Sequence, residues 1–282
     1  MDITRTVEDL RARVRVWRGE GGTVGLVPTM GGIHGGHLAL VRAAGERVDH
    51  TVATLFVNPR QFGAGEDFGA YPRNEEEDAR RLEAGGVELL FAPPESVMYP
   101  ADHSTRVEVA DLGSILEGAF RPGFFTGVAT VVTKLLLQVV PDAALFGEKD
   151  FQQLRVIQRM VRDLDVPVEI VGVPTVRESD GLALSSRNLY LSAPEREIAP
   201  ALFATLCAVA EAVRAGADPE ERERWAESEL ASAGFEHVDY VAVRDGATLG
   251  RYLGRDAAGQ GPGRVLAAAR LGTTRLIDNV AV

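Results

Sequence analysis

The sequence predicts an α/β protein with a doubly wound, Rossmann-like parallel sheet over residues 1–175 and a smaller α+β domain over residues 176–282. Three observations support this fold class. Short, continuous apolar segments recur along the first part of the chain, as expected for strands buried on both faces of a parallel sheet. Segments with helical periodicity alternate with them. Past residue 190 the pattern changes to two helices followed by three strands.

The predicted strands of the first domain are apolar runs bounded by turn residues. The five strands are residues 23–27, 51–57, 87–92, 143–146 and 168–173. An irregular stretch separates the third strand from the fourth, and residues 103–110 within it form a candidate edge strand.

Helical periodicity predicts the segments that connect these strands. Thr6 and Asp9 occupy the positions of a capping box before the first helix, and Asn74 caps a charged helix that stops at two glycines. Pro141 follows the most apolar helix. The predicted helices of this domain are residues 7–17, 37–46, 74–84, 127–139 and 151–164.

The second domain has a different order of elements. Two long helices, residues 194–215 and 218–233, precede three short strands at residues 238–244, 264–270 and 274–280. Helices grouped before strands indicate a small α+β unit rather than a continuation of the parallel sheet.

Composition narrows the classes of function. The chain has 41 acidic and 30 basic residues and a formal charge of −11, which argues against a general nucleic-acid binder. Its single cysteine, Cys207, excludes an intramolecular disulfide. No apolar run approaches the ~20 residues of a membrane span, and the charged N-terminus predicts no signal peptide. We therefore expect a soluble cytoplasmic protein that binds neither nucleic acid nor membrane.

Unusual polar segments follow four of the five predicted strands. They are PTMGGIHGGHL (28–38), NPRQF (58–62), GEKD (147–150) and PTVRESDGLALSSRN (174–188). Right-handed crossovers place the carboxyl ends of parallel strands at the same edge of a sheet, and α/β sheets bind ligands there. The four segments therefore predict one composite site.

The segment after the first strand suits an anion. Glycines at a strand-to-helix turn let main-chain N–H groups approach a phosphate, and a helix N-terminus adds about half a positive charge. His37 is expected at the start of that helix and His34 on the loop just before it. Both rings can donate hydrogen bonds to phosphate oxygens.

Charged and hydroxyl side chains from two other segments complete a predicted polyphosphate clamp. Lys149 brings a point charge, and Ser185–Arg187 brings two hydroxyls and a guanidinium suited to bidentate phosphate contact. Gln61 and Gln153 are uncharged and suit a second, small polar ligand.

Other interpretations of the glycine–histidine segment are a flexible hinge or a zinc site. Zinc needs further ligands, and His50, His103 and His237 show no ligand spacing with the pair or with the single cysteine. The joint placement of four polar segments favours the phosphate site over either alternative.

The segment PTMGGIHGGHL resembles the PTMGxLHxGH signature of the pantoate–β-alanine ligases, which belong to the HIGH-motif nucleotidyltransferase superfamily. The resemblance continues in order through FVNPRQF, YPR, FRPGFFTGV, PDAALFGEKDFQQL, VGVPTVRESDGLALSSRN and LGTTRLIDN. It covers nearly the whole chain and is therefore far more specific than HxGH alone.

The resemblance implies a ligase of the coenzyme A pathway with two steps. Pantoate attacks the α-phosphate of ATP to give a pantoyl adenylate and pyrophosphate, and β-alanine then displaces AMP to give pantothenate. It also implies Mg²⁺ with the ATP, and a homodimer. The alternatives are another nucleotidyltransferase that forms no amide and a catalytically silent nucleotide-binding protein.

Site residues are implied by matching positions in this sequence. The ATP-binding positions are Met30, Gly31, Gly32, Ile33, His34, Gly35, Gly36, His37, Gly147, Glu148, Lys149, Asp150, Val176, Leu184, Ser185, Ser186 and Arg187. Four of them, His34, His37, Lys149 and Arg187, are expected to be catalytic, with His37 as the proton donor. The positions expected to contact pantoate or β-alanine are Thr29, Met30, Asn58, Gln61 and Gln153. Asp78 is the expected Mg²⁺ position.

The sequence departs from the family pattern at three positions. Phe124 stands where a histidine is usual, Leu184 replaces a methionine, and Phe151 replaces a common tyrosine. None of these changes removes either predicted histidine, the lysine, the arginine or a glutamine, so an active enzyme is expected.

Overall fold

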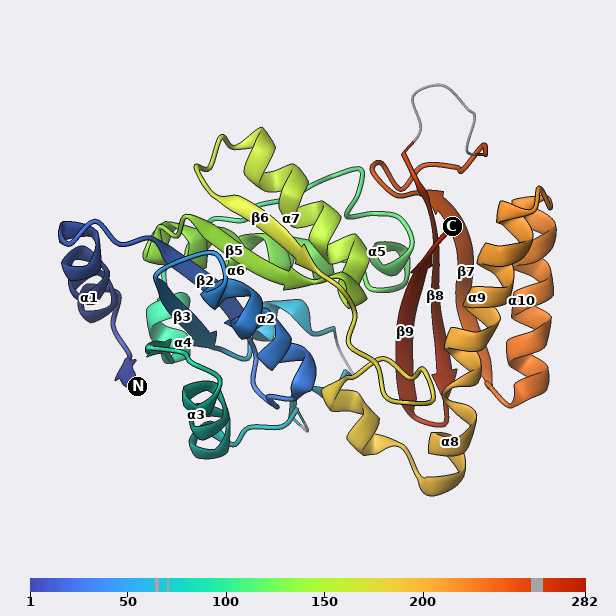
Figure 1. Ribbon diagram of the computed structural model, residues 1–282, viewed down its shortest axis with the longest axis horizontal. Helices are drawn as coiled ribbons and strands as arrows, with labels where there is room; N and C mark the ends of the chain where they lie inside the picture. Colours follow the sequence, from blue (N-terminus) through green and yellow to red (C-terminus); the bar gives the residue numbers. More distant parts are fainter. Residues whose placement is uncertain (64–65, 70, 255–260) are drawn as a thin grey trace. The chain divides into compact units, whose positions relative to one another are not determined.

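The computed structural model describes residues 1–63, 66–69, 71–254 and 261–282 (Figure 1). These residues form two compact units. Unit 1 comprises Met1–Glu148 and Val156–Pro174, and unit 2 comprises Lys149–Arg155 and Thr175–Val282. The chain passes into unit 2 at Lys149, returns to unit 1 within a helix, and passes into unit 2 again at Thr175.

Within the described residues, unit 1 forms a six-stranded parallel sheet in the order β1–β4–β3–β2–β5–β6 (Figure 1). The strands are β1 (Asp2–Thr4), β2 (Val24–Thr29), β3 (His50–Leu55), β4 (Leu89–Phe91), β5 (Ala143–Gly147) and β6 (Glu169–Val173). The predicted parallel α/β sheet is confirmed. Because β3 and β5 flank β2, the strand order reverses beside β2, where α/β sheets commonly bind ligands.

Helices alternate with these strands, and sequence signals mark the starts of two of them. They are α1 (Val7–Gly19), α2 (Gly35–Gly45), α3 (Glu75–Ala84), α4 (Glu95–Met98), α5 (Glu117–Phe120), α6 (Phe124–Val139) and α7 (Phe151–Asp163). Thr6 accepts a hydrogen bond from the Asp9 N–H at the start of α1, and Asn74 caps α3 in the same way, as predicted.

Both faces of the central strand β2 are buried. Val27 packs in a core cluster with Leu40 of α2 and Leu82 of α3. Leu26 alternates to the opposite face and is also fully buried, and α6 packs against β2. Because both faces of β2 are buried, its sequence is an uninterrupted apolar run.

The carboxyl ends of β2, β3, β5 and β6 lie at one edge of the sheet, because these four strands are parallel and adjacent. The chain leaves this edge at Met30, Phe56, Glu148 and Pro174. The prediction that four polar segments begin at the same sheet edge is therefore confirmed for the strand ends of unit 1.

Unit 2 combines an antiparallel sheet with helices, as predicted. Over the part of the chain that the structure describes, the sheet has three strands in the order β7–β8–β9, with α9 and α10 packed against it (Figure 1). Its elements are α8 (Ala193–Ile198), α9 (Ala201–Arg214), α10 (Pro219–Ala233), β7 (His237–Asp245), β8 (Gly263–Leu271) and β9 (Thr274–Ala281). A separate apolar core, which includes Leu206, Leu230 and Val265, holds the helices on the sheet.

Two predicted elements were wrong, and one strand was missed. Residues 103–110 form no strand. The helix predicted over residues 194–215 is two helices, α8 and α9, because Pro200 lacks the N–H that a continuous helix needs. Strand β1 was not predicted, since three residues are too few to show a period.

No helix among the described residues has the length and apolarity that a membrane span requires.

Candidate active site

Two glycines in the left-handed region shape the loop between β2 and α2. Gly31 and Gly32 have φ values of +103° and +63°, which residues with a Cβ rarely adopt. A Cβ on Gly31 would also lie 3.0 Å from Oδ2 of Asp78. Just before the loop, the buried hydroxyl of Thr29 donates to the main-chain oxygen of Thr54 at 2.6 Å. The hydroxyl therefore ties the end of β2 to β3.

Asp78 supports this loop from the first turn of α3. Its carboxylate is buried, with Oδ2 accepting from the N–H of Gly32 at 3.0 Å and Oδ1 from the N–H of Ile33 at 2.8 Å. Arg81, one turn along α3, donates to the carbonyl of Ile33 at 2.9 Å. Both carboxylate oxygens thus bind loop amides, which gives Asp78 a supporting role in this loop; its role as the Mg²⁺ position, which the resemblance implies, stays a prediction. Within the described ranges, no three His, Cys, Asp or Glu side chains are grouped to hold a metal ion.

The two predicted histidines lie together at the N-terminus of α2. Nδ1 of His34 accepts from the N–H of Gly36 at 3.1 Å, and Nδ1 of His37 accepts from the N–H of His34 at 3.3 Å. The ring centroids are 4.1 Å apart. A neutral imidazole whose Nδ1 accepts a hydrogen bond carries its proton on Nε2. The pair therefore provides two ring N–H donors at the positive end of a helix.

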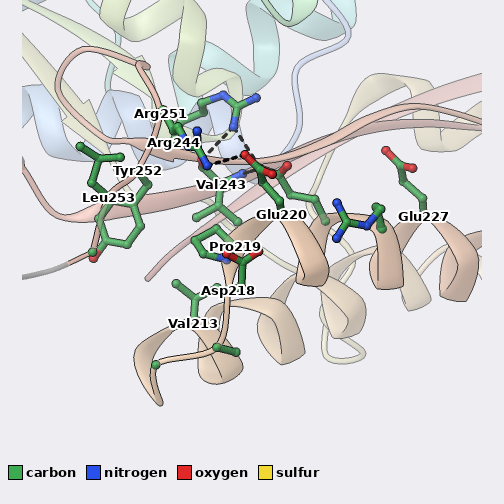
Figure 2. A pocket seen from close by; sticks show the side chains of 15 residues that line it. Val213, Asp218, Pro219, Glu220, Glu227, Val243, Arg244, Arg251, Tyr252 and Leu253 are labelled. Carbon is green, nitrogen blue, oxygen red and sulfur yellow. Dashed lines mark hydrogen bonds and ion pairs between the residues drawn. The ribbon is translucent and has the colours of Figure 1, made fainter.

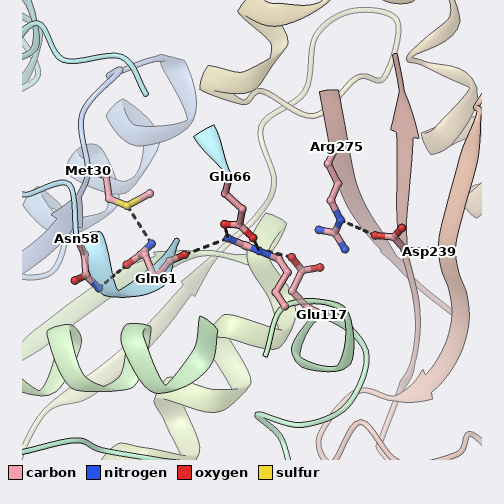
Figure 3. A network of polar contacts seen from close by, with 8 residues as sticks. Met30, Asn58, Gln61, Glu66, Glu117, Asp239 and Arg275 are labelled. Atoms are coloured by element: carbon pink, nitrogen blue, oxygen red, sulfur yellow. Dashed lines mark hydrogen bonds and ion pairs between the residues drawn. The ribbon is translucent and has the colours of Figure 1, made fainter. Parts of the chain in front are cut away.

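Gln61 belongs to a buried polar cluster that joins three elements (Figure 3). Its Nε2 donates to Sδ of Met30 at 3.0 Å, and its Oε1 accepts from Nδ2 of Asn58 at 3.0 Å. Asn58 also donates to the carbonyl of Gly127 in α6 at 3.1 Å. A Cβ on Gly127 would lie 2.1 Å from the carbonyl oxygen of Arg60, so only glycine permits this approach. The predicted substrate residues Met30, Asn58 and Gln61 are thus brought together.

Tyr99 holds the other side of this cluster and was not predicted. Its hydroxyl donates to Oδ1 of Asn58 at 2.9 Å. Burial raises the pKa of Tyr99 to about 12, although the guanidinium of Arg60 above its ring opposes the shift. The phenol therefore stays protonated at neutral pH and remains a donor. This donation orients the amide of Asn58, whose other end faces Gln61.

Unit 2 carries the predicted lysine. Lys149 lies in a short 3₁₀ turn (Glu148–Asp150), and its Nζ is 3.8 Å from Oδ2 of Asp150. Its main-chain oxygen accepts a hydrogen bond from Nδ2 of Asn279 at 2.9 Å. Gln153 is half-buried in the first turn of α7.

The serine–arginine segment follows a narrow hairpin in unit 2. The hairpin is closed by a hydrogen bond of 2.9 Å from the N–H of Leu184 to the carbonyl of Val176. Ser185 then caps a 3₁₀ turn (Ser186–Tyr190), accepting from the N–H of Arg187 at 3.2 Å. Arg177 of the hairpin pairs with Asp278 of β9 through two hydrogen bonds, of 2.6 and 2.8 Å.

The residues that sequence reasoning missed are those that support the predicted ones: Tyr99, Arg121, Arg177, Arg264, Asp278 and Asn279. Four of them, Arg121, Arg177, Asp278 and Asn279, lie in motifs that carry the family resemblance, namely FRPGFFTGV, VGVPTVRESDGLALSSRN and LGTTRLIDN. The sequence therefore marked these segments without indicating which side chains they contact.

Comparison with known proteins identifies the family. A family model described as pantoate-β-alanine ligase matches residues 2–281. The chain belongs to the pantoate–β-alanine ligase family. The resemblance seen in the motifs is thereby confirmed.

Curated and solved relatives agree with this family. A pantothenate synthetase of Rhodospirillum rubrum is 54% identical over 282 residues, which is 100% of this chain and 99% of the relative. A solved pantothenate synthetase of Thermus thermophilus is 48% identical, with a TM-score of 0.91 and 99% of each chain covered. A pantoate-β-alanine ligase of Francisella tularensis, solved with β-γ ATP and β-alanine, is 31% identical, with a TM-score of 0.81 and coverage of 100% of this chain and 97% of that one.

Two of the departures from the ligase family pattern have structural explanations. Phe124 packs its ring against the guanidinium of Arg121, 3.8 Å from its centre. That guanidinium also pairs with Glu66 and Glu117 and donates to the main-chain oxygen of Gln61 at 3.1 Å (Figure 3). Phe124 thus helps hold an arginine that supports the Gln61 turn.

Phe151 lies between two other guanidinium groups. Those of Arg155 and Arg264 are 4.7 and 4.2 Å from its ring centre. The ring is buried. Cation–π contacts depend on the aromatic ring itself, so phenylalanine can make them without the hydroxyl of tyrosine.

A hollow of about 860 Å³ on unit 2 is separate from the ligase family motifs (Figure 2). Its charged lining is largely paired, with Arg251 bonded to Glu220 at 2.6 Å and Arg244 to Glu223 at 3.0 Å. Its lining contains none of the predicted site residues. We therefore assign the active site by the motif residues rather than by this hollow.

Proposed function

We propose that the chain joins pantoate and β-alanine at the expense of ATP and releases pantothenate, AMP and pyrophosphate. Membership of the pantoate–β-alanine ligase family supports this reaction. The observation that carries it is the histidine pair at the N-terminus of α2, at the sheet edge where the strand order reverses. That arrangement suits the phosphates of a nucleotide.

The reaction needs adenylation because a free carboxylate is a poor acyl donor. In the first step a carboxylate oxygen of pantoate attacks the α-phosphate, the bond to the bridging oxygen breaks, and pyrophosphate leaves. In the second step the amine of β-alanine attacks the acyl carbon, loses a proton and displaces AMP. Both steps require positioned reactants and stabilised charge on phosphate oxygens.

The glycine loop and the start of α2 are proposed to bind the ATP phosphates. The segment Met30–His37 presents main-chain N–H groups, and the Nε2–H groups of His34 and His37 add two directed donors. His37 is proposed to donate its hydrogen bond to phosphate oxygens as negative charge develops there. Because Nδ1 of each ring is held by a main-chain N–H, the rings need no reorientation to do so.

The motif residues of unit 2 are proposed to bind ATP. Lys149 contributes a cation and Arg187 a bidentate guanidinium, while Ser185 and Ser186 contribute hydroxyls. The main chain at Gly147–Asp150, Val176 and Leu184 is proposed to contact the remainder of ATP.

The uncharged amides are proposed to select the small substrates. Gln61 and Asn58 are fixed by hydrogen bonds from neighbouring side chains, so they offer oriented donors and acceptors to pantoate and β-alanine. Thr29, Met30 and Gln153 are proposed to complete these contacts. Mg²⁺ is proposed to accompany ATP as a phosphate complex.

One assay tests this function against its alternatives. Purified protein is supplied with ATP, Mg²⁺, D-pantoate and β-alanine, and AMP, pyrophosphate and pantothenate are measured. The proposal expects the three products in equal amounts. AMP without pantothenate would indicate a nucleotidyltransferase that forms no amide, and bound ATP without AMP would indicate a silent nucleotide-binding protein.

The homodimer and the cytoplasmic location implied by the resemblance are also part of this proposal. Light scattering behind size-exclusion chromatography tests the first, with twice the chain mass expected. Cell fractionation tests the second.

A further inference from the structure

Two neighbouring residues of β9, Asp278 and Asn279, contact both of the predicted phosphate-binding segments of unit 2. Both side chains are almost fully buried, at 4% and 2% exposed. Consecutive residues of a strand point to opposite faces of a sheet. The two side chains therefore contact different segments of the chain.

Asn279 holds the lysine segment. Its Nδ2 donates to the main-chain oxygen of Lys149 at 2.9 Å. Its Oδ1 accepts from Nε of Arg264 at 2.6 Å, which fixes the orientation of the amide. The guanidinium of Arg264 also packs on the ring of Phe151, two residues after the lysine. The lysine is thus anchored through its main-chain oxygen, and this contact does not involve its ammonium group, which lies 3.8 Å from Oδ2 of Asp150.

Asp278 holds the hairpin that leads to Ser185–Arg187. Its two oxygens accept from the two terminal nitrogens of Arg177, in the bidentate geometry that is most restrictive for an arginine–carboxylate pair. Arg177 also donates to the carbonyls of Gly181 and Asn279 and packs on the ring of Phe203. The base of the hairpin is therefore bound to β9 at several points.

We propose that Asp278 and Asn279 are positioning residues for adenylation, which set the place of Lys149 and of the Ser185–Arg187 segment through contacts on the two faces of β9. This inference rests on the proposed function, in which those segments bind ATP. A rigid strand is a suitable support because misplacing a catalytic group by about 1 Å costs on the order of a hundredfold in rate.

The test is a double-mutant cycle between Asn279→Asp and Lys149→Ala, read as pantoate-dependent exchange of pyrophosphate into ATP. Asn279→Asp keeps the shape and the acceptor for Arg264, but it places a carboxylate oxygen against the Lys149 carbonyl. We expect a ten- to hundredfold lower rate at saturating ATP, with the KM for β-alanine in the full reaction unchanged. Because Asn279 acts largely by placing the lysine side chain, the loss of rate in the double variant should be well below the product of the two single losses.

Asp239→Asn is the matched control. Asp239 is a buried carboxylate of the same sheet that accepts from Arg275 of β9 at 2.6 Å, and it contacts neither phosphate-binding segment in the described structure (Figure 3). Its loss should lower the melting temperature and leave the exchange rate at the wild-type value. An equal loss of rate in Asp239→Asn and Asn279→Asp would reduce the role of Asn279 to general stability and overturn the proposal.

The outcomes separate the two levels of inference. Two results would overturn the positioning role alone. One is slow exchange in Lys149→Ala together with a wild-type rate in Asn279→Asp. The other is a double variant in which the two single losses of rate multiply. A wild-type rate in Lys149→Ala would overturn the role of the lysine and the positioning inference together. If Asn279→Asp does not fold, Arg177→Lys tests the other face of β9. It keeps the charge, loses the bidentate pair and should also slow exchange, and a wild-type rate would contradict the proposal.

Discussion

Replacing Asp78 separates a loop support from a metal ligand. Its carboxylate accepts two main-chain hydrogen bonds, of 3.0 and 2.8 Å, from Gly32 and Ile33. Hydrogen bonds to a charged group contribute roughly 1.5–3 kcal/mol each, so the two together contribute about 3–6 kcal/mol. In Asp78→Ala, water that enters the vacated space recovers part of this free energy. We therefore expect Asp78→Ala to lose about 3 kcal/mol of unfolding free energy. At roughly 2–4 °C per kcal/mol, the melting temperature should fall by about 6–12 °C.

The assay pairs thermal unfolding in EDTA with a Mg²⁺ titration of pantothenate formation. In EDTA the loss of stability should persist, because the hydrogen bonds involve no metal. The activity of Asp78→Ala should also fall, because the glycine loop loses its support, but the Mg²⁺ concentration for half-maximal activity should match the wild type. Glu76→Ala, at an exposed position in the same helical turn, is the control for helix changes and should leave stability and Mg²⁺ dependence unchanged. A wild-type melting temperature together with a raised Mg²⁺ requirement in Asp78→Ala would refute the loop assignment.

Three further predictions follow from the geometry. His37→Ala and Lys149→Ala should each slow adenylation by about a hundredfold, as loss of charge stabilisation typically does, and a wild-type rate of pyrophosphate exchange would make that residue structural. Gly127→Ala should lower both the melting temperature and the affinity for pantoate, because its Cβ would lie 2.1 Å from the carbonyl oxygen of Arg60; unchanged pantoate binding by calorimetry would contradict this. Burial raises the pKa of Asp245, but hydrogen bonds from a threonine hydroxyl and three main-chain N–H groups outweigh it and lower the pKa below its usual value. The stability that these bonds provide should be complete above pH ~4 and lost as the pH falls through the lowered pKa, so wild type and Asp245→Asn should converge in denaturant stability in acid but not at neutral pH.

Local patterns predicted most of the fold because local physics determines those elements. Apolar runs are sufficient for the central strands, and the caps at Thr6 and Asn74 depend on residues three positions apart. Strand β1 escaped prediction because its three residues are held by pairing with β4 rather than by a pattern of their own. The helix predicted over residues 194–215 is divided at Pro200 in the structure. The N–H that proline lacks was a signal available in the sequence.

The sequence did not show which side chains hold the site residues in place, because the residues in each contact are far apart along the chain. Arg177 and Asp278 are 101 residues apart, and Lys149 and Asn279 are 130 apart. The contacts of Asp78 could not be predicted either, since the sequence of a first helical turn is the same whether its carboxylate faces water or a buried loop. Motif residues could be identified from their types and spacing, whereas the side chains that hold them required coordinates.

The most direct measurement of the central claim follows oxygen from pantoate to the nucleotide. Pantoate labelled with oxygen-18 in its carboxyl group is converted with ATP and β-alanine, and the AMP is examined by mass spectrometry. Attack of the carboxylate on the α-phosphate predicts that AMP carries one oxygen from pantoate. Unlabelled AMP, or ADP and inorganic phosphate in place of AMP and pyrophosphate, would contradict a pantoyl adenylate.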